Sequence, residues 1–512
     1  MSLDDTTIRV VESARESAIL PGPALTILFH PDVRRVGQIV RLSRLGELSR
    51  VAPKFSAHGE KGGLPLTDRG LSRKPLSLQT LSDGGYRISP PSGGGPVRVD
   101  GEPLLTAEDV NRDELERGVV IQLSNRVVLL WHMAGPPREF VDDLGIVGHS
   151  HRIVELRDDL LRVADLSHSV LIVGESGSGK ELVARAIHRA SARRDGPCIC
   201  VNMATIPPAT AASQLFGHTR GAFTGAGAAH TGFFTRSSGG TMFLDEIGDT
   251  PLDVQAMLLR AIETGEIFPL GAETPQSVDV RFVAATDADL SQAVSDGVFR
   301  EQLLHRLSSY VLVVPPLRER REDIGRLFFH FLRRELDFIG ELDRLKPPKA
   351  VESTWIPASL VAQLARFDWP GNVRQLRNVA RQLAVANRGE SRFRTPPALS
   401  RLLDSPAVPE PTPRGERSES GSISEDELIA ALRECRWQPS RTAAYLGISR
   451  SALYNLMNRS KRIRKARDYN LEQIAACAEE CMGDLDAMAE KLELSKRGLQ
   501  LRMAELGLGG RG

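Results

Sequence analysis

Residues 170–187 of the chain read Val-Leu-Ile-Val-Gly-Glu-Ser-Gly-Ser-Gly-Lys-Glu-Leu-Val-Ala-Arg-Ala-Ile. The apolar run 170–173 predicts a buried strand, and the residues after Lys180 have helical spacing. A strand, a G-x-x-x-x-G-K loop and a helix in this order are typical of a phosphate-binding loop. Glycines let backbone N–H groups turn toward a polyphosphate, and the lysine adds positive charge. The stretch therefore predicts an α/β nucleotide-binding domain.

The predicted nucleotide contacts are the residues of this loop and the residue after it. Glu181 stands where such loops usually carry a Ser or Thr that binds Mg²⁺. The full set is Gly174, Glu175, Ser176, Gly177, Ser178, Gly179, Lys180 and Glu181.

A second predicted strand, 241–244, ends in the acidic pair Asp245-Glu246, about 65 residues after the loop. We expect Asp245 to hold Mg²⁺ and Glu246 to polarise the attacking water. Acidic pairs after strands often only cap a following helix. Together with the phosphate-binding loop, however, this pair favours ATP hydrolysis with ATP and Mg²⁺ as cofactors.

Length and composition limit the remaining possibilities. With 512 residues, 41% hydrophobic and 26% charged, the chain is expected to form three or four folded domains. Lys and Arg number 66 and Asp and Glu 65, which excludes an overall basic coat but leaves room for a local basic patch. No stretch approaches 18 uncharged apolar residues, so a membrane partner is not expected. The start carries no cationic leader, which predicts a cytoplasmic protein.

The chain divides into three ordered blocks. Short alternating runs between turns predict a β-sandwich over 24–133, and alternating strands and helices predict a parallel α/β domain over 142–395. The proline-rich segment 396–422 is expected to be a flexible linker. The block 423–508 is expected to be all-helical.

The hexapeptide Gly221-Ala-Phe-Thr-Gly-Ala226 lies between the phosphate-binding loop and the strand that ends in Asp245-Glu246. It resembles the signature of the AAA+ activators of sigma-54 RNA polymerase, the bacterial enhancer-binding proteins, and the resemblance covers about 145–390. It implies a ring-forming ATPase, expected to be a hexamer, with a helical lid over about 318–395, that remodels the sigma-54 holoenzyme. The loop formed by Gly221, Ala222, Phe223, Thr224, Gly225 and Ala226 would present Phe223 and Thr224 to that partner. The structural alternative is a surface turn with Phe223 tucked inward.

The same resemblance assigns further site residues one by one. Asn202 looks like the switch asparagine that senses the nucleotide through Glu246, and Arg374 like the sensor II arginine. Arg300 and Arg306 resemble the arginine fingers given to a neighbouring subunit, although both could be ordinary exposed helix arginines. Asp287 stands where the family usually has Asn. A carboxylate near a γ-phosphate is repelled unless it is protonated or turned away, so turnover is expected to be altered.

The segment 440–456 reads as helix, Gly turn, helix, and resembles the Fis-type helix-turn-helix of these activators. From Cys435 to Arg467 there are nine Lys/Arg and no Asp/Glu, which favours binding to the phosphates of upstream promoter DNA. The expected groove-facing residues are Ser449, Arg450, Ser451, Tyr454 and Asn455.

An internal repeat follows with an offset of 46 residues. It aligns Leu446 with Leu492 and Leu453 with Leu499, so 470–506 is predicted to be a second helix-turn-helix. Acidic residues far outnumber the single lysine between Glu472 and Glu493. Phosphates would be repelled by such a face, so the first unit is expected to read DNA and the second mainly to pair with another subunit or weakly to extend the DNA footprint.

The first block resembles a forkhead-associated (FHA) domain. Ser49-Arg50, Leu71-Ser72-Arg73 and Asp100-Gly101 follow the order of that family, but Pro75 replaces a frequent His and Asp100 a usual Asn. Arg50, Ser72 and Arg73 are expected to bind a phosphothreonine of a partner protein. The alternative is a sandwich that only packs against partners.

Two rival functions remain open from the residues. A protein-remodelling AAA+ unfoldase would share the nucleotide elements but needs neither the hexapeptide nor a helix-turn-helix. A DNA-binding repressor with a vestigial ATPase is supported only by Asp287.

Overall fold

The computed structural model describes residues 21–404, apart from 43–45, 61, 82–84, 137–142, 225 and 348–353, and parts of 425–503. The chain divides into two compact units, Met1–Ser405 and Pro406–Gly512, which are described separately. Within the described residues, no helix combines the length and the apolar character needed to cross a bilayer.

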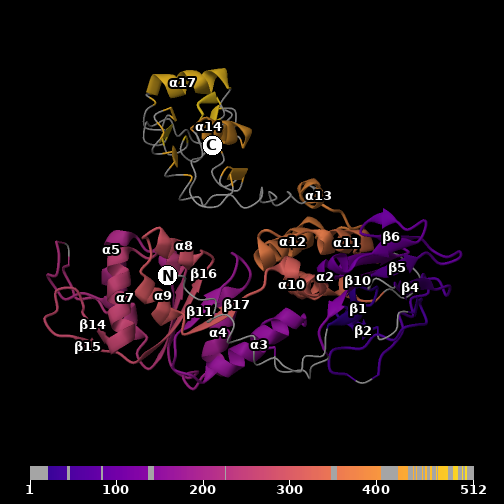
Figure 1. The fold of residues 1–512 in the computed structure, drawn as a ribbon, viewed down its shortest axis with the longest axis horizontal. Coiled ribbons are helices and arrows are strands. Elements are labelled where there is room, and N and C mark those ends of the chain that lie inside the picture. Colours follow the sequence, from indigo (N-terminus) through magenta and orange to yellow (C-terminus); the bar gives the residue numbers. More distant parts are fainter. Residues whose placement is uncertain are drawn as a thin grey trace. The chain divides into compact units, whose positions relative to one another are not determined.

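The first domain is a sandwich of two antiparallel sheets (Figure 1). Its core lies between the sheets and contains Leu25, Ile27 and Trp131. The larger sheet has the order β2 (Ile39–Arg41), β1 (Gly22–Phe29), β10 (Val127–Ala134), β9 (Val119–Leu123), β6 (Val97–Val99) and β7 (Glu102–Pro103). The smaller sheet has the order β3 (Glu47–Leu48), β4 (Leu76–Thr80), β5 (Tyr86–Ser89) and β8 (Glu108–Val110). The helix α2 (Arg112–Arg117) starts at a capping box formed by Asn111 and Glu114.

The second domain is built on a parallel five-stranded sheet. The strand order is β12 (Cys198–Asn202), β13 (Gly240–Asp245), β16 (Val280–Thr286), β11 (Val170–Val173) and β17 (Tyr310–Val313). One face packs against α3 (His151–Ala164) and α4 (Lys180–Ala190). The other packs against α5 (Pro208–Phe216), α7 (Leu252–Thr264), α8 (Leu290–Ser295) and α9 (Glu301–Leu307). Helices on both faces explain why these strands are apolar on both sides.

The lid follows the sheet and is made of helices. Its helices are α10 (Ile324–Phe338), α11 (Ala358–Arg366), α12 (Asn372–Ala386) and α13 (Pro397–Asp404). The prediction of a flexible linker starting at 396 was wrong for its first residues. Pro397 occupies the start of α13, where a missing N–H costs nothing, and Leu399, Leu402 and Leu403 pack into the lid core at helical spacing. Residues 405–424 lie outside the described part of the chain.

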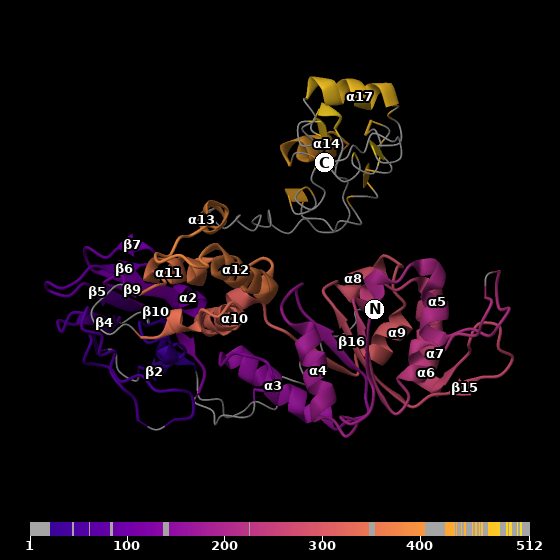
Figure 2. The same ribbon diagram turned by 180° about the vertical axis from the view of Figure 1, so that it is seen from behind.

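The sandwich and the lid share one hydrophobic core, and both ribbon views show α10 and α11 beside the larger sheet (Figures 1 and 2). Phe29 of β1 stacks on Phe329 of α10 with ring centroids 5.9 Å apart. Gly325 permits this contact, because a methyl group there would collide with the backbone carbonyl of Leu28. The sandwich is therefore packed directly on the ATPase lid.

The second unit contains two small helical cores. The first includes Leu428 of α14 (Glu425–Glu434) together with Leu446, Leu453 and Met457. The second includes Ile474 of α17 (Leu471–Glu480) together with Leu492, Leu499 and Met503. Each member of the second set lies 46 positions after its counterpart, which is the offset of the repeat in the sequence.

Candidate functional site

The phosphate-binding loop connects β11 to α4 at the carboxyl edge of the parallel sheet. Gly177 and Gly179 have φ angles of 76° and 116°, which residues other than glycine rarely adopt. The Lys180 Nζ donates to the Gly174 carbonyl at 2.8 Å and lies 3.9 Å from Glu246 Oε1. The loop therefore combines the helix N-terminus and a buried ammonium group, as a polyphosphate site requires.

The acidic pair lies at the same carboxyl edge of the sheet, at the end of β13, which β16 separates from β11. Asp245 ends β13, and Glu246 follows with a left-handed φ of 52°. Asn202 faces Asp245 in the strand register, and its Nδ2 lies 3.4 Å from Asp245 Oδ2. The structure thus brings the switch candidate Asn202 to Asp245, whereas the sequence interpretation linked it to Glu246.

Electrostatics bias both carboxyl groups toward protonation. Burial raises the pKa of Asp245 and of Glu246 above the ordinary carboxyl values, and the nearby Lys180 ammonium opposes both shifts. Asp287, directly after β16, lies close enough for its negative charge to add to the rise of the Glu246 pKa. The unusual Asp287 is therefore a neighbour of the predicted general base.

A network joins the phosphate-binding loop to the lid. Arg318 contacts Glu175 through two oxygens, at 2.6 and 2.9 Å. Asn372, at the start of α12, donates to Glu175 Oε2 at 2.9 Å, and its own Oδ1 accepts from the Leu317 N–H at 2.8 Å. The predicted sensor II residue Arg374 donates to Ser176 Oγ at 3.1 Å. Arg318 and Asn372 were not singled out from the sequence, because their shared partner Glu175 is 143 and 197 positions away.

Three other predicted site residues lie on the exposed surface. Glu181 forms an ion pair with Arg185 along α4, at 2.7 Å. Arg306 pairs with Glu263 at 2.9 Å, and Arg300 donates to the Leu252 carbonyl. The finger role of the two arginines in a neighbouring subunit stays a prediction.

The 221–226 loop is closed by its own backbone. The Gly221 N–H donates to the Ala226 carbonyl, and Ala226 N–H donates to Phe223 O. Phe223 is 47% exposed, with its ring edge-on to His218 at 5.0 Å, and Thr224 is exposed. Gly225 lies outside the described residues. The loop therefore displays one aromatic side chain on a folded base instead of burying it.

The sandwich carries a small cavity whose lining includes Arg50, Ser72 and, unexpectedly, Lys74. The Arg50 N–H donates to the Ser72 carbonyl, and the Lys74 N–H donates to Ser72 Oγ. Arg73 is exposed and does not line this cavity. Lys74, the next residue in the sequence, lines it instead, and the role of Arg73 in phosphopeptide binding stays a prediction. Asp100 lies elsewhere, where its carbonyl accepts a hydrogen bond from Arg366 of the lid.

The five DNA-binding candidates Ser449, Arg450, Ser451, Tyr454 and Asn455 fall outside the described residues. Leu446 before them and Leu453 among them belong to the first core of the second unit.

Three regions of the chain match models of known protein families. Residues 146–313 match the family model of the sigma-54 interaction domain. Residues 318–395 match the AAA+ ATPase lid domain, and 422–459 match the Fis family of bacterial regulatory proteins. The chain thus contains an AAA+ P-loop ATPase with its lid, followed by a Fis-type helix-turn-helix. The sandwich precedes all three matched regions.

The chain is also similar to curated bacterial regulators and to a solved structure. The transcriptional regulator NtrC of Escherichia coli K12 is 47% identical over 245 residues, covering 48% of this chain and 50% of NtrC. The regulatory protein AtoC of the same strain is 40% identical over 313 residues, covering 60% and 66%. A crystal structure of NtrX from Brucella abortus with ADP is 33% identical, covers 62% of this chain and 69% of that one, and has a TM-score of 0.45. The chain spans only about half the length of NtrC.

Proposed function

We propose that this protein is an ATP-hydrolysing transcription activator that remodels sigma-54 RNA polymerase at promoters bound through its helix-turn-helix. The observation that carries the proposal is the displayed Phe223–Thr224 tip on the same domain as a phosphate-binding loop, an acidic pair and a lid arginine. A nucleotide site alone would fit many ATPases. The combination with an exposed aromatic loop and a DNA-binding domain fits an activator.

The residues present suit ATP and Mg²⁺. Ser178 Oγ is buried and has no hydrogen-bond partner in the described part of the chain, and it lies near the buried Lys180 in the loop that would hold the phosphates. Asp245 would hold Mg²⁺, which neutralises charge on the phosphates when it is bound. Glu246 would take a proton from the attacking water, and Arg300 and Arg306 would act on the site of the next subunit in a ring, expected to be a hexamer.

Coupling between the nucleotide and the lid would run through Glu175 and Asn372. Asn372 holds Glu175 of the loop and the Leu317 N–H at the entrance to the lid. A change in loop position on hydrolysis would therefore move the lid, and with it the sandwich that shares its core.

For the sandwich we propose phosphopeptide binding of the FHA kind. Arg50, Ser72 and Lys74 supply a guanidinium, a hydroxyl and an ammonium group to one cavity, which suits a phosphothreonine. This cavity and the face on the lid involve different residues, so binding and packing are compatible.

The first helix-turn-helix would read DNA, and the second would mainly pair subunits. Arg450→Ala should abolish operator binding, whereas Lys496→Ala, its repeat counterpart, should weaken it much less. Comparable losses from both variants, measured at one salt concentration, would instead establish two equivalent DNA-reading units.

The deciding experiment is transcription in vitro from a sigma-54 promoter with purified polymerase. Open complexes should form with ATP and not with a non-hydrolysable analogue. Open complexes without hydrolysis would overturn the proposal, and repression of a promoter without ATP turnover would favour a repressor. ATP-dependent unfolding of a substrate protein, without any effect on transcription, would favour an unfoldase.

A further inference from the structure

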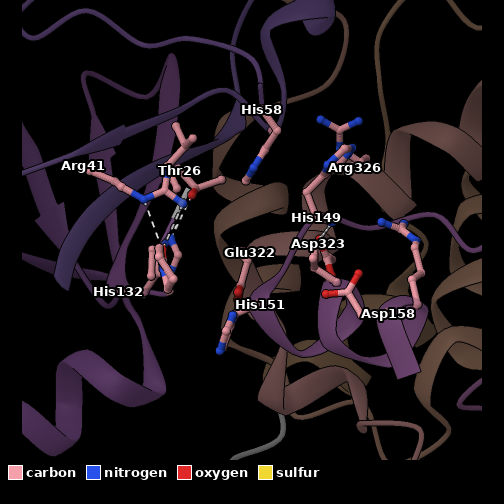
Figure 3. A pocket seen from close by; sticks show the side chains of 17 residues that line it. Thr26, Arg41, His58, His132, His149, His151, Asp158, Glu322, Asp323 and Arg326 are labelled. Atoms are coloured by element: carbon pink, nitrogen blue, oxygen red, sulfur yellow. Dashed lines mark hydrogen bonds between the residues drawn. The ribbon is translucent and has the colours of Figure 1, made fainter. Parts of the chain in front are cut away.

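The cavities at the border between the sandwich and the ATPase domain differ in the charge of their lining. The cavity in Figure 3 is lined by arginines and histidines together with the acidic residues Asp158, Glu322 and Asp323. Another is a groove of about 450 Å³ between the sandwich and the lid helix α11, and none of its described lining residues is acidic. Positive charge in this groove is therefore not balanced by the lining itself.

One face of α11 forms the lid side of the groove. The residues that line it from this helix have helical spacing and are Ser359, Ala362, Gln363 and Arg366. The helix contacts β9, and both ribbon views show it next to β6 (Figures 1 and 2). Gly101 lies opposite, and a methyl group there would collide with the Arg366 guanidinium. A lid arginine thus approaches the backbone of the sandwich closely.

Two guanidinium groups, of Arg98 in β6 and Arg366 in α11, line the groove. Arg98 Nη1 donates to the Gly101 carbonyl at 2.8 Å, and Arg366 Nη1 donates to the Asp100 carbonyl at 2.6 Å. Neither arginine forms an ion pair with a described residue. The Asp100 carboxyl group, which lies near Arg366, accepts from the Val120 N–H at 2.9 Å and does not line the groove. Both arginines therefore retain N–H groups for a carboxylate of a ligand.

Uncharged donors accompany the arginines. Gln122 and Asn125 line the groove from the sandwich, and Gln122 Nε2 donates to Asn125 Oδ1 at 2.8 Å. Because the oxygen of Asn125 is occupied, its amide N–H groups are the part left for a ligand. The groove thus combines charged and uncharged donors, which suits carboxylate oxygens.

The groove borders the cavity proposed for phosphothreonine. Ser124 lines that cavity and the next residue, Asn125, lines the groove, and the same holds for Gly95 and Pro96. The Ser124 N–H donates to the Pro96 carbonyl at 2.8 Å, so these two segments lie side by side. An extended peptide advances about 3.3 Å per residue. A peptide held by its phosphothreonine could therefore enter the groove within a few residues.

We propose that the groove binds acidic side chains of the same peptide, so that the ligand of the sandwich is an acidic phosphothreonine peptide. Its carboxylates would accept from Arg98 of the sandwich and from Arg366 of the lid. This inference rests on the phosphothreonine binding proposed above and adds the class of sequence that is recognised. Because Arg366 belongs to α11, the bound peptide would contact the ATPase lid directly.

The test measures peptide affinity by fluorescence anisotropy with the full-length chain at constant ionic strength. Three phosphothreonine peptides are compared: one with Asp and Glu before the phosphothreonine, one with Asp and Glu after it, and one with Asn and Gln in their place. One of the two acidic peptides should bind about ten-fold or more tightly than the neutral peptide, as expected for charge-assisted hydrogen bonds. Arg50→Ala should abolish the binding of all three.

Substitutions in the groove locate the source of this gain. Arg98→Gln and Arg366→Gln should each remove most of it and leave the affinity for the neutral peptide within about two-fold, while Arg366→Lys should keep part of the gain because the charge remains. The matched control is Arg333→Gln, an exposed lid arginine that does not line the groove, and it should leave the gain unchanged. Arg98 is hydrogen-bonded within the sandwich, so its variant decides even if Arg366→Gln loosens the packing on the lid.

The outcomes separate the groove from the phosphothreonine cavity. Equal binding of the acidic and neutral peptides by the parent, abolished by Arg50→Ala, would overturn the groove as a binding site and retain the phosphothreonine cavity. A gain that survives both Arg98→Gln and Arg366→Gln would also overturn it, since the acidic residues would then bind elsewhere. Binding of none of the peptides would overturn this inference together with the proposed phosphopeptide function.

Discussion

At the scale of single residues, the most informative departure is Asp287 beside the predicted base. Besides burial, the negative charge of Asp287 raises the pKa of Glu246 above its ordinary value. A base with a raised pKa is ionised over a smaller range of pH, and only its ionised form can take the proton of water. We therefore expect Asp287 to lower ATP turnover without removing any catalytic group.

Asp287→Asn should therefore increase ATP turnover. The asparagine removes one negative charge and can donate to Glu246, so the pKa of Glu246 should fall and the acid limb of the rate–pH profile should move to lower pH. The measurement is steady-state phosphate release between pH 5.5 and 8. An unchanged profile would show that Asp287 does not control the base.

Glu246→Gln provides the reference for that experiment. ATP binding should persist, because Lys180 and Asp245 are retained, while hydrolysis should fall by on the order of 100-fold or more, as for loss of a general base. Parental hydrolysis by this variant would show that another group activates the water.

At the scale of elements, a substitution in the 221–226 loop should separate ATP hydrolysis from open-complex formation. Thr224 is exposed on a loop closed by the Gly221–Ala226 hydrogen bond, and no contact joins it to the phosphate-binding loop in the described residues. Thr224→Ala should leave ATP hydrolysis within about two-fold of the parent, while sigma-54-dependent open-complex formation fails. An equal loss of both activities would place the loop in the nucleotide site.

Gly325 tests how firmly the lid helix holds the sandwich. Gly→Ala inside a helix normally stabilises by about 1 kcal/mol. Here the new methyl group would collide with the Leu28 carbonyl in β1. Leu28 lies at an irregularity in the β1–β10 pairing, but it is fully buried in the core that the sandwich shares with the lid, so there is little room for it to move. Overpacking costs about 1–3 kcal/mol, so Gly325→Ala should lower the unfolding temperature. Gly22→Ala, which meets open space, should change the temperature little, and equal temperatures for both would contradict the packing argument.

Sequence patterns predicted those parts of the site that are formed by residues close together in the sequence. The phosphate-binding loop and the Asp245-Glu246 pair meet because the carboxyl ends of parallel strands share one edge. The Glu175–Arg318–Asn372 network was missed, since residues up to 197 positions apart have no spacing signal. The packing of the sandwich on the lid did leave a trace, because 127–134 reads Val-Val-Leu-Leu-Trp-His-Met-Ala without alternation, which indicates burial on both faces.

At the scale of the whole molecule, buried histidines between the domains predict acid sensitivity. Burial lowers the pKa of His58 and His132 to about 4 and that of His149 to about 3, from 6.5. The unfolded chain therefore binds more protons than the folded chain below pH 6.5, and the stabilisation present above that pH is lost progressively toward pH 4 and 3. Glu322, whose pKa burial raises to about 8, acts in the opposite direction between pH 4.5 and 8.

A comparison of variants isolates the histidine contribution. Between pH 7 and 5, the unfolding temperature of His149→Gln should fall less than that of the parent. The control is His151→Gln, because His151 lines the same cavity but faces Glu155 at 3.2 Å. Parallel temperature–pH curves for the parent and His149→Gln would remove the histidines as the cause.

The shared core of sandwich and lid also limits how such a regulator can be recombined. Replacing 22–134 with an unrelated sensor would leave Phe328, Phe329 and Leu332 of the lid facing water, and the new sensor would have no surface shaped to cover them. Regulators that exchange sensory domains freely need a tether in place of a common core. In this lineage, sensor and lid should instead be inherited as one block, so substitutions in Leu28 or Phe29 should be accompanied by substitutions in the lid helix that faces them.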